Sequence, residues 1–285
     1  MKTFLVISGK GGTGKTVLAG SLAVIAENKV MADCDVDAAD LHLLLHPKIQ
    51  ERHDFPGGQK AVINKEVCRA CGRCMRHCRF EAITPDFVVD PFSCEGCGLC
   101  RELCRHGAIR MEESVAGEWF VSSTGYGPLV HAKLGVAEDN SGKLVAKVRQ
   151  VAKELAQQER RDFVIVDGPP GIGCPVIAAL SGVDCALGVT EPTLSGLHDA
   201  QRVIDVARHF RADVKMVINK YDLNEQVTAE IEAWCRSGKL PLIGRIPFEP
   251  AVVEAMLQCR TVVEWAPRSA AAGEIAAIHL QIFQS

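Results

Sequence analysis

Residues 8–16 read Ser8-Gly9-Lys10-Gly11-Gly12-Thr13-Gly14-Lys15-Thr16, between an apolar run, 3–7, and a run of helix-forming residues, 17–26. Strand, glycine-rich turn and helix in this order are the context of a phosphate-binding loop, and Gly9–Thr16 matches its pattern G-x-x-x-x-G-K-[ST]. The glycines allow backbone N–H groups to approach phosphate oxygens, and the helix N-terminus adds unpaired donors. We therefore expect Gly9–Thr16 to bind a nucleotide, with Lys15 on the outer phosphates and Thr16 on Mg²⁺.

Length and composition limit the class of protein. The 285 residues are 47% hydrophobic and 24% charged, which indicates a globular chain with one large core and room for a small second module. The formal net charge of −3 argues against generic nucleic-acid binding. No run approaches the roughly 18 apolar residues that span a bilayer, so we expect no membrane insertion. Thirteen cysteines without a secretion signal indicate metal ligation in a reducing compartment, hence a cytoplasmic protein.

Acidic residues follow a predicted strand close to the loop. The short apolar run 29–33 ends in Asp33-Cys34-Asp35. Carboxylates at the carboxyl end of a parallel strand, beside a phosphate loop, lie where Mg²⁺ and an attacking water are handled. Strands alternate with helical runs along the chain, so we expect an α/β fold with a doubly wound, mostly parallel sheet.

The early lysine, Lys10, makes the loop more specific. Gly-Lys-Gly-Gly-Thr-Gly-Lys-Thr resembles the deviant Walker A motif of the MinD/ParA family of P-loop ATPases. This resemblance implies ATP hydrolysis in an ATP-dependent homodimer, in which Lys10 reaches the nucleotide of the partner subunit. Lys15 and Mg²⁺ would stabilise charge on the phosphoryl group. By position in the family's motif, Asp35 would orient the attacking water and help to hold the metal, and Asp33 would support it.

Later segments extend the same resemblance. Phe163–Asp167 resembles the Walker B strand, so Asp167 would hold Mg²⁺ with Thr16 and Asp35. A further strand closes in Asn219-Lys220, and by resemblance Asn219 would contact the adenine base. The C-terminal run 270–283 lacks the lysines and arginines of a membrane-binding amphipathic helix, which departs from MinD and argues against membrane cycling.

Between about residues 62 and 113 the chain changes character. Two runs follow the spacing C-x₂-C-x₂-C-x₃-C, namely Cys68, Cys71, Cys74 and Cys78, then Cys94, Cys97, Cys100 and Cys104. This spacing is the signature of a bacterial two-cluster ferredoxin, in which the fourth cysteine of each run ligates the other cluster. We expect one [4Fe–4S] cluster on Cys68, Cys71, Cys74 and Cys104, and the other on Cys78, Cys94, Cys97 and Cys100. Two zinc sites are the alternative, but zinc ribbons use paired C-x₂-C.

The predicted ferredoxin module is rich in arginine. Its arginines are Arg69, Arg73, Arg76, Arg79, Arg101, Arg105 and Arg110. Arg79 and Arg105 stand where ferredoxins usually carry proline after the fourth cysteine. Such cations either raise the reduction potential of a cluster and dock an acidic redox partner, or are solvated charges balanced by nearby acids. Both interpretations stay open at this point.

The domain organisation follows from these segments. We expect a P-loop ATPase domain in two parts, 1–58 and 115–285, with a ferredoxin-like α+β domain inserted at 59–114 and a linker over 47–59. Cys174 lies in the segment after the Walker B strand. It is a candidate for a thiol or metal site across a dimer axis, or simply a small residue at a helix start.

Two classes of function fit this combination. In one, an ATPase cycle gates electron transfer through the clusters to a redox partner that the sequence does not identify. In the other, the cycle hands an iron–sulfur cluster or metal cofactor to an apo-protein. Full cysteine ligation favours the first, because a donated cluster needs labile ligands. A redox sensor whose clusters regulate dimerisation is a third hypothesis.

Overall fold

The computed structural model describes residues 1–135 and 141–283. The chain forms two compact units. The larger contains Met1–His53, Trp119–Lys133 and the chain from Ser141 onward, and the smaller contains Asp54–Glu118 and a short stretch from Leu134. None of the helices in the described ranges is long and apolar enough to cross a lipid bilayer.

Parallel strands form the sheet of the larger unit. In chain order they are β1 (Lys2–Ser8), β2 (Lys29–Asp33), β5 (Gly127–Leu134), β6 (Phe163–Pro170), β7 (Cys185–Thr190), β8 (Asp213–Asn219) and β9 (Leu242–Ile246). They lie side by side in the order β5-β2-β6-β1-β7-β8-β9. β1 pairs with β6 on one side and β7 on the other, and every residue from Thr3 to Ser8 is buried. A strand covered on both faces is apolar nearly throughout, as this one is.

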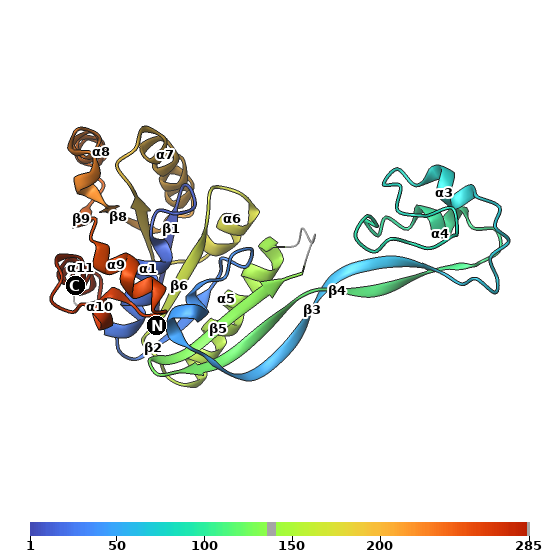
Figure 1. The fold of residues 1–285 in the computed structure, drawn as a ribbon, viewed down its shortest axis with the longest axis horizontal. Helices are drawn as coiled ribbons and strands as arrows, with labels where there is room; N and C mark the ends of the chain where they lie inside the picture. Colours follow the sequence, from blue (N-terminus) through green and yellow to red (C-terminus); the bar gives the residue numbers. More distant parts are fainter. Residues whose placement is uncertain (136–140, 284–285) are drawn as a thin grey trace. The chain divides into compact units, whose positions relative to one another are not determined.

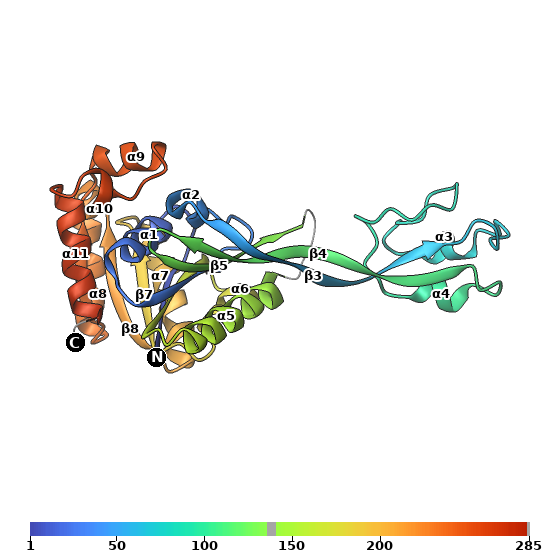
Figure 2. The ribbon, with the colours of Figure 1, turned by 90° about the horizontal axis from the view of Figure 1, so that it is seen from below.

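Helices cover both faces of this sheet (Figures 1 and 2). They are α1 (Lys15–Ile25), α2 (Leu41–Leu45), α5 (Ser141–Gln158), α6 (Cys174–Leu180), α7 (Leu194–His209), the 3₁₀ turn η1 (Tyr221–Leu223), α8 (Glu225–Ser237), α9 (Pro250–Leu257), α10 (Val262–Trp265) and α11 (Ala270–Phe283). The connections β1-α1-β2 and β5-α5-β6 run along the sheet in opposite directions. Because both are right-handed, their helices lie on opposite faces. α1 packs with α10 and α11, and α5 packs with α6.

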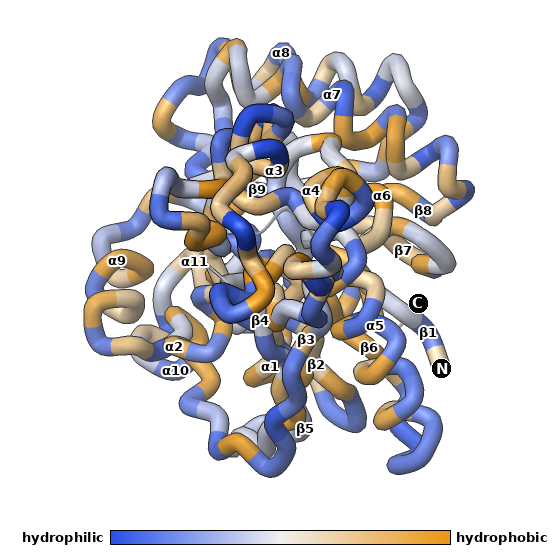
Figure 3. Tube along the Cα trace, turned by 90° about the vertical axis from the view of Figure 1, so that its right-hand side faces the viewer, coloured by the Kyte–Doolittle hydropathy of each residue, from blue (hydrophilic) through white to orange (hydrophobic). Residues whose placement is uncertain are grey.

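Local sequence signals explain where two of these helices begin. The side chain of Thr193 accepts a hydrogen bond from the Gly196 N–H at the start of α7, and Asn224 does the same for Val227 in α8. Hydrophilic and hydrophobic residues alternate along both helices in Figure 3. One face of each is therefore buried against the sheet. The predicted doubly wound, mostly parallel α/β sheet is confirmed.

The prediction of a linker over residues 47–59 is wrong. Residues 48–59 belong to β3 (Lys48–Ile63), which precedes β4 (Ile109–Thr124) and β5 in the strand order. The glycines that suggested a linker allow a close approach of strands. A Cβ on Gly57 would lie 2.3 Å from the Cβ of Ala116. Glycine in a strand marks such an approach.

Within the smaller unit the two cysteine runs have the same local structure. α3 (Arg73–His77) follows Gly72, and α4 (Leu99–Leu103) follows Gly98. Both glycines are left-handed, with φ of 71° and 74°. The two helices pack against each other. Each ends at the fourth cysteine of its run, Cys78 or Cys104, in an extended conformation, so the unit contains an internal structural repeat.

Candidate functional site

The predicted phosphate loop connects the end of β1 at Ser8 to the start of α1 at Lys15. Gly12 and Gly14 have positive φ, 78° and 94°. A Cβ on Gly14 would lie 2.2 Å from the side-chain nitrogen of Asn219, and a Cβ on Gly9 would lie 2.3 Å from the backbone carbonyl of Asp199. Both positions therefore require glycine, because any side chain would displace a neighbouring segment.

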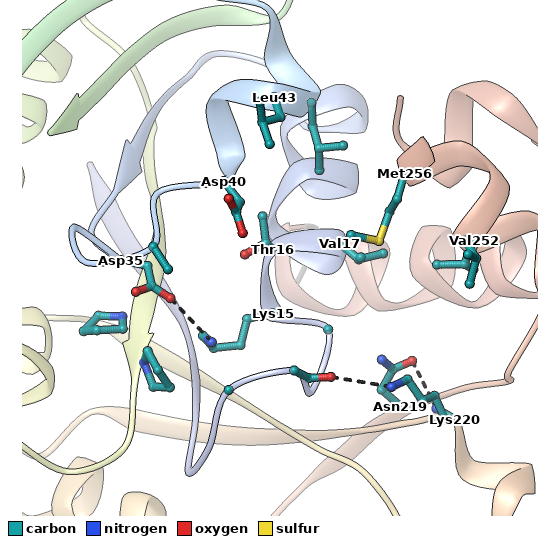
Figure 4. A pocket seen from close by; sticks show the side chains of 18 of the residues that line it. Lys15, Thr16, Val17, Asp35, Asp40, Leu43, Asn219, Lys220, Val252 and Met256 are labelled. Atoms are coloured by element: carbon teal, nitrogen blue, oxygen red, sulfur yellow. Dashed lines mark hydrogen bonds and ion pairs between the residues drawn. The ribbon is translucent and has the colours of Figure 1, made fainter. Parts of the chain in front are cut away.

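Lys15 lies under the loop, close to the acids that follow β2. Its side chain is buried, and its Nζ is 3.9 Å from Oδ2 of Asp35 (Figure 4). Burial raises the pKa of Asp35, and Lys15 opposes that rise. The Thr13 hydroxyl is buried without a hydrogen-bond partner among the described residues. The loop thus presents a cation and an unpaired hydroxyl where the sequence predicts phosphate.

Asp33, the last residue of β2, is paired in register with Asp167 of β6. Asp33 accepts the N–H groups of Asp35 and Leu41, each at 3.2 Å, so its carboxylate holds the loop that follows β2. In the described part of the chain, neither carboxyl oxygen of Asp167 has a hydrogen-bond partner of good geometry. Burial raises the pKa of Asp167 to about 7, against the opposing effects of Thr16 and Lys15. Burial and Asp167 also raise the pKa of Asp33.

These groups fit a Mg²⁺ ion. Mg²⁺ prefers oxygen ligands and is commonly held by one or two carboxylates together with substrate phosphates and water. Within the described residues, Asp167 offers two buried oxygens without a hydrogen-bond partner of good geometry, and Thr16 and Asp35 line the adjacent pocket. Across the ranges that the structure describes, no three His, Cys, Asp or Glu side chains form a ligand set for one ion by themselves. A magnesium site here would therefore draw on the hydroxyl and on the nucleotide.

Asn219 braces the loop from the end of β8. Its side-chain nitrogen donates to the Thr13 carbonyl at 2.8 Å. Its oxygen accepts the Lys220 N–H at 3.0 Å (Figure 4). Both Asn219 and Lys220 line the pocket that opens from the loop. The adenine contact that the resemblance implies for Asn219 stays a prediction.

A pocket of about 660 Å³ extends from the loop toward α9. Its size is that of a small-molecule site. Sequence reasoning missed its apolar wall, which includes Leu43, Pro247, Phe248, Val252 and Met256. Met256 points toward Val17 of α1 in Figure 4. Pro247 and Phe248 follow β9 directly, so the rule that ligands bind at the carboxyl ends of parallel strands could have indicated them.

Lys10 is turned away from this pocket and does not line it. Its Nζ forms an ion pair with Glu191 at 2.7 Å and lies 3.3 Å from the hydroxyls of Thr193 and Ser195. Lys220 also pairs with Glu191, at 3.4 Å. Burial favours a higher pKa for Glu191, but Lys10 and Lys220 together hold the pKa below its ordinary value. In this structure the Glu191 carboxylate therefore forms ion pairs with both Lys10 and Lys220.

Two cavities in the smaller unit are lined by cysteines. The first cavity is lined by Cys68, Cys71, Cys74 and Cys104, and the second cavity by Cys78, Cys94, Cys97 and Cys100. Each cavity thus combines three cysteines of one run with the fourth cysteine of the other. Burial raises the pKa of Cys74 and Cys100, and neighbouring cysteines act in the same direction. Four thiols around a cavity are the donor set of a [4Fe–4S] cubane, so the residues fit such a cluster.

Most of the chain matches a known protein family. Residues 4–262 match the family described as CobQ/CobB/MinD/ParA nucleotide binding domain. An uncharacterized protein of Methanocaldococcus jannaschii is 37% identical over 222 residues, or 77% of this chain and 78% of that protein. The cell division ATPase MinD of Pyrococcus furiosus has a similar structure, with a TM-score of 0.61 and 20% identity over 99% of this chain and 98% of that one. MinD from Pyrococcus horikoshii, complexed with Mg-ADP, gives 0.61 and 18% over 99% and 96%.

Proposed function

Because this chain belongs to the CobQ/CobB/MinD/ParA family of nucleotide-binding domains, we propose that its ATP cycle gates electron transfer through two [4Fe–4S] clusters. The chain is an ATP hydrolase of the MinD/ParA type. The single observation that carries the link to electron transfer is the pair of cavities, each with the four cysteines that the spacing predicts.

ATP binds in the pocket beside Gly9–Thr16. Backbone N–H groups of the loop and the Lys15 ammonium hold the phosphates, while Thr16 and Asp167 hold Mg²⁺, which neutralises charge that develops during phosphoryl transfer. Asp35, whose Oδ2 lies 3.9 Å from the Nζ of Lys15, orients the attacking water in this proposal. The apolar wall that contains Phe248 and Met256 suits the flat base of a nucleotide.

The clusters bind in the two cavities of the smaller unit. When bound, each cluster supplies a one-electron redox centre whose potential is set by nearby charges and solvent. The eight cysteines hold the clusters fully, which supports a permanent redox role over donation. Each cluster is held by both runs, so its loss would require both to open.

Dimerisation is the step that ATP controls. Lys10 is paired with Glu191 in this structure and has to leave it to reach the nucleotide of a second chain. The homodimer therefore forms when ATP is bound, and hydrolysis releases it. Such a cycle would time the contact between the clusters and a redox partner.

Anaerobic purification followed by iron and sulfide analysis and electron paramagnetic resonance tests the cluster assignment. We expect about eight irons per chain and two interacting reduced [4Fe–4S] signals. The second measurement is the rate of electron transfer from the reduced protein to a redox dye, with MgATP and with MgADP. ATP should change this rate in the wild type and not in a Lys15→Ala variant.

An apo-ferredoxin acceptor distinguishes electron transfer from the competing function, which is donation of a cluster to an apo-protein. The loaded protein is incubated with MgATP and the acceptor, and iron is counted again after separation. Retention of all iron supports electron transfer. Loss of half or more to the acceptor, only when ATP is hydrolysed, would make the protein a cluster carrier and would refute the proposal.

A further inference from the structure

The two cysteine-lined cavities differ in the charge of their other residues. Arg69, Arg73 and His106 also line the first cavity, and no carboxylate does. The second cavity is lined by Arg79 and His77, but also by the carboxylate residue Glu95. The first cavity is therefore the more cationic of the two.

The same asymmetry continues on the surface of the smaller unit. Arg69 and Arg73 line the first cavity, Arg76 lies against Gly72 of its lining, and Arg105 follows Cys104 in the chain. We call these four arginines the basic edge. No acidic residue occurs between Val67 and Phe80. Among the described residues, none of the four forms an ion pair, whereas Arg101 and Arg110 pair with Glu102 and Glu112. The positive charge of the basic edge is thus not neutralised within the unit.

A cysteine of the first cavity reaches the surface within this edge. Cys71 is exposed and stands between Arg69 and Arg73 in the chain. The next residue, Gly72, has no side chain to cover it, and a Cβ there would lie 3.0 Å from a guanidinium nitrogen of Arg76. The first cavity is therefore accessible to a partner at a point surrounded by cations.

The second cavity opens onto a different surface. Its exposed cysteine, Cys97, is flanked by Glu95 in the chain, and Phe92 and Leu99 nearby are 63% and 45% exposed. This surface is mixed in charge and partly apolar. The surfaces at the two cavities of the smaller unit thus differ in charge and in exposed apolar side chains.

We propose that the basic edge is the docking face for an acidic redox protein, which reduces the cluster in the first cavity. The inference rests on the proposed function, because it needs a cluster in that cavity. In the transfer, the partner loses one electron and the cluster gains it, and no proton or bond changes hands. Opposite charges speed the encounter of two proteins and make it dependent on salt. The surrounding cations also favour the reduced cluster.

A protein partner fits this surface better than a nucleic acid. Proteins that bind single strands combine cations with exposed aromatic rings on which bases stack. Phe87, which lines the first cavity, is half-buried. Phe80 lines the second cavity, is also half-buried, and has the guanidinium of Arg79 over its ring, 4.8 Å from the ring centre. The exposed ring, Phe92, belongs to the segment at the second cavity.

The test uses the full chain, purified anaerobically, and a reduced acidic two-cluster ferredoxin as the electron donor. One variant reverses three charges of the basic edge, Arg69→Glu, Arg73→Glu and Arg76→Glu. The matched control carries Arg101→Glu, Arg110→Glu and Arg268→Glu, which change the net charge equally elsewhere. At low salt we expect the second-order rate constant of reduction to fall at least about tenfold in the first variant and to stay within about twofold of wild type in the control. High salt should lower the wild-type rate toward that of the first variant.

Binding of the oxidised ferredoxin, followed by fluorescence anisotropy, is measured in parallel with iron content. If iron is present and the reversed variant binds and accepts electrons like the control, the inference is wrong and the proposed function stands. If wild type holds no iron, the proposed function fails, whatever the binding result. Should the reversal prevent cluster loading, the neutral pair Arg69→Gln and Arg76→Gln takes its place, with an expected loss of severalfold. Tighter binding of a labelled single-stranded RNA than of ferredoxin, lost on reversal, would overturn the proposal.

Discussion

Lys10 and Glu191 form a 2.7 Å ion pair that keeps the lysine out of the nucleotide pocket of its own chain. The pair is partly shielded, with 29% of the Lys10 side chain and 19% of the Glu191 side chain exposed. The hydroxyls of Thr193 and Ser195 complete the surroundings of the ammonium. In the proposed homodimer Lys10 acts on the nucleotide of the second chain, so breaking its contact with Glu191 would be a cost of dimerisation.

Replacing Glu191 by glutamine should make dimerisation easier. Glutamine keeps the shape but removes the charge that attracts Lys10, and an ion pair of this exposure contributes about 0.5–1 kcal/mol. A homodimer breaks two such pairs, so we expect the protein concentration for half-maximal dimerisation with a non-hydrolysable ATP analogue to fall about five- to thirtyfold, as measured by sedimentation velocity. Lys10→Ala should dimerise poorly in either background. An unchanged dimerisation constant in Glu191→Gln would mean that the pair does not restrain the lysine.

Gly14→Ala should disable the nucleotide site. The added Cβ would lie 2.2 Å from the Asn219 side chain, and φ of 94° is unfavourable for alanine by about 1–2 kcal/mol. We expect ATP affinity, measured by calorimetry, to fall at least about tenfold. Gly273→Ala in α11 is the matched control, because a Cβ at Gly273 meets no atom within 4 Å and the residue lies outside the loop. Its thermal unfolding midpoint should be no lower than that of wild type, and equal loss of affinity in both variants would contradict the steric argument.

Asp167→Asn should stabilise the metal-free protein while abolishing Mg²⁺-dependent hydrolysis. Burial raises the pKa of Asp167 to about 7, so the folded state binds a proton that the unfolded state releases above pH 4. Without Mg²⁺, wild-type stability should therefore fall as pH rises from about 4 to 7, and the variant should lose that part of the slope. At pH 7 we expect a gain of about 1–3 kcal/mol by urea unfolding. Mg²⁺ with ADP should stabilise wild type more than the variant.

His131 should make the larger unit sensitive to mild acid. It lies in β5, shares a 3.0 Å hydrogen bond with Ser122 and stacks against Phe120. Burial, helped by His42, lowers its pKa to about 4, so the unfolded state binds more protons between pH 6.5 and 4. Stability should then fall as pH drops through this range, by at most about 3 kcal/mol from this residue. In His131→Gln the slope of unfolding free energy against pH should be shallower there. An identical slope would place the acid sensitivity elsewhere.

Cys78→Ser should remove the cluster of the second cavity, although Cys78 belongs to the first run. Cys78 lines the second cavity with Cys94, Cys97 and Cys100. We expect iron to fall from about eight to about four per chain, or to a three-iron cluster signal by electron paramagnetic resonance. Cys235→Ser, at a buried lone cysteine in α8, should keep the full iron content. Retention of the second cluster in Cys78→Ser would refute the exchange of ligands between runs.

Much of this structure could be predicted from the sequence, because the strongest signals come from residues that are close together in the chain. Residues 8–16 alone predict strand, turn and helix, and the cysteine spacing predicts two sets that the two cavities bring together. What the sequence did not predict depends on contacts between distant segments. The apolar wall at Phe248 and Met256 forms only when the loop after β9 and helix α9 reach α1. The polar, glycine-containing start of β3 was predicted as a linker because nothing nearby in the chain indicates Ala116 as the neighbour of Gly57.

The exchange of fourth cysteines between the two runs affects how the chain matures during synthesis. The second cavity gains its full set of thiols only when residue 100 has been made, and the first only when residue 104 has been made. A nascent chain that ends after Cys78 already contains four cysteines in one tight run, yet it has the complete ligands of neither cavity. Both sets become complete within four residues of each other, so translation passes through almost no stage at which one site could be loaded and the other not.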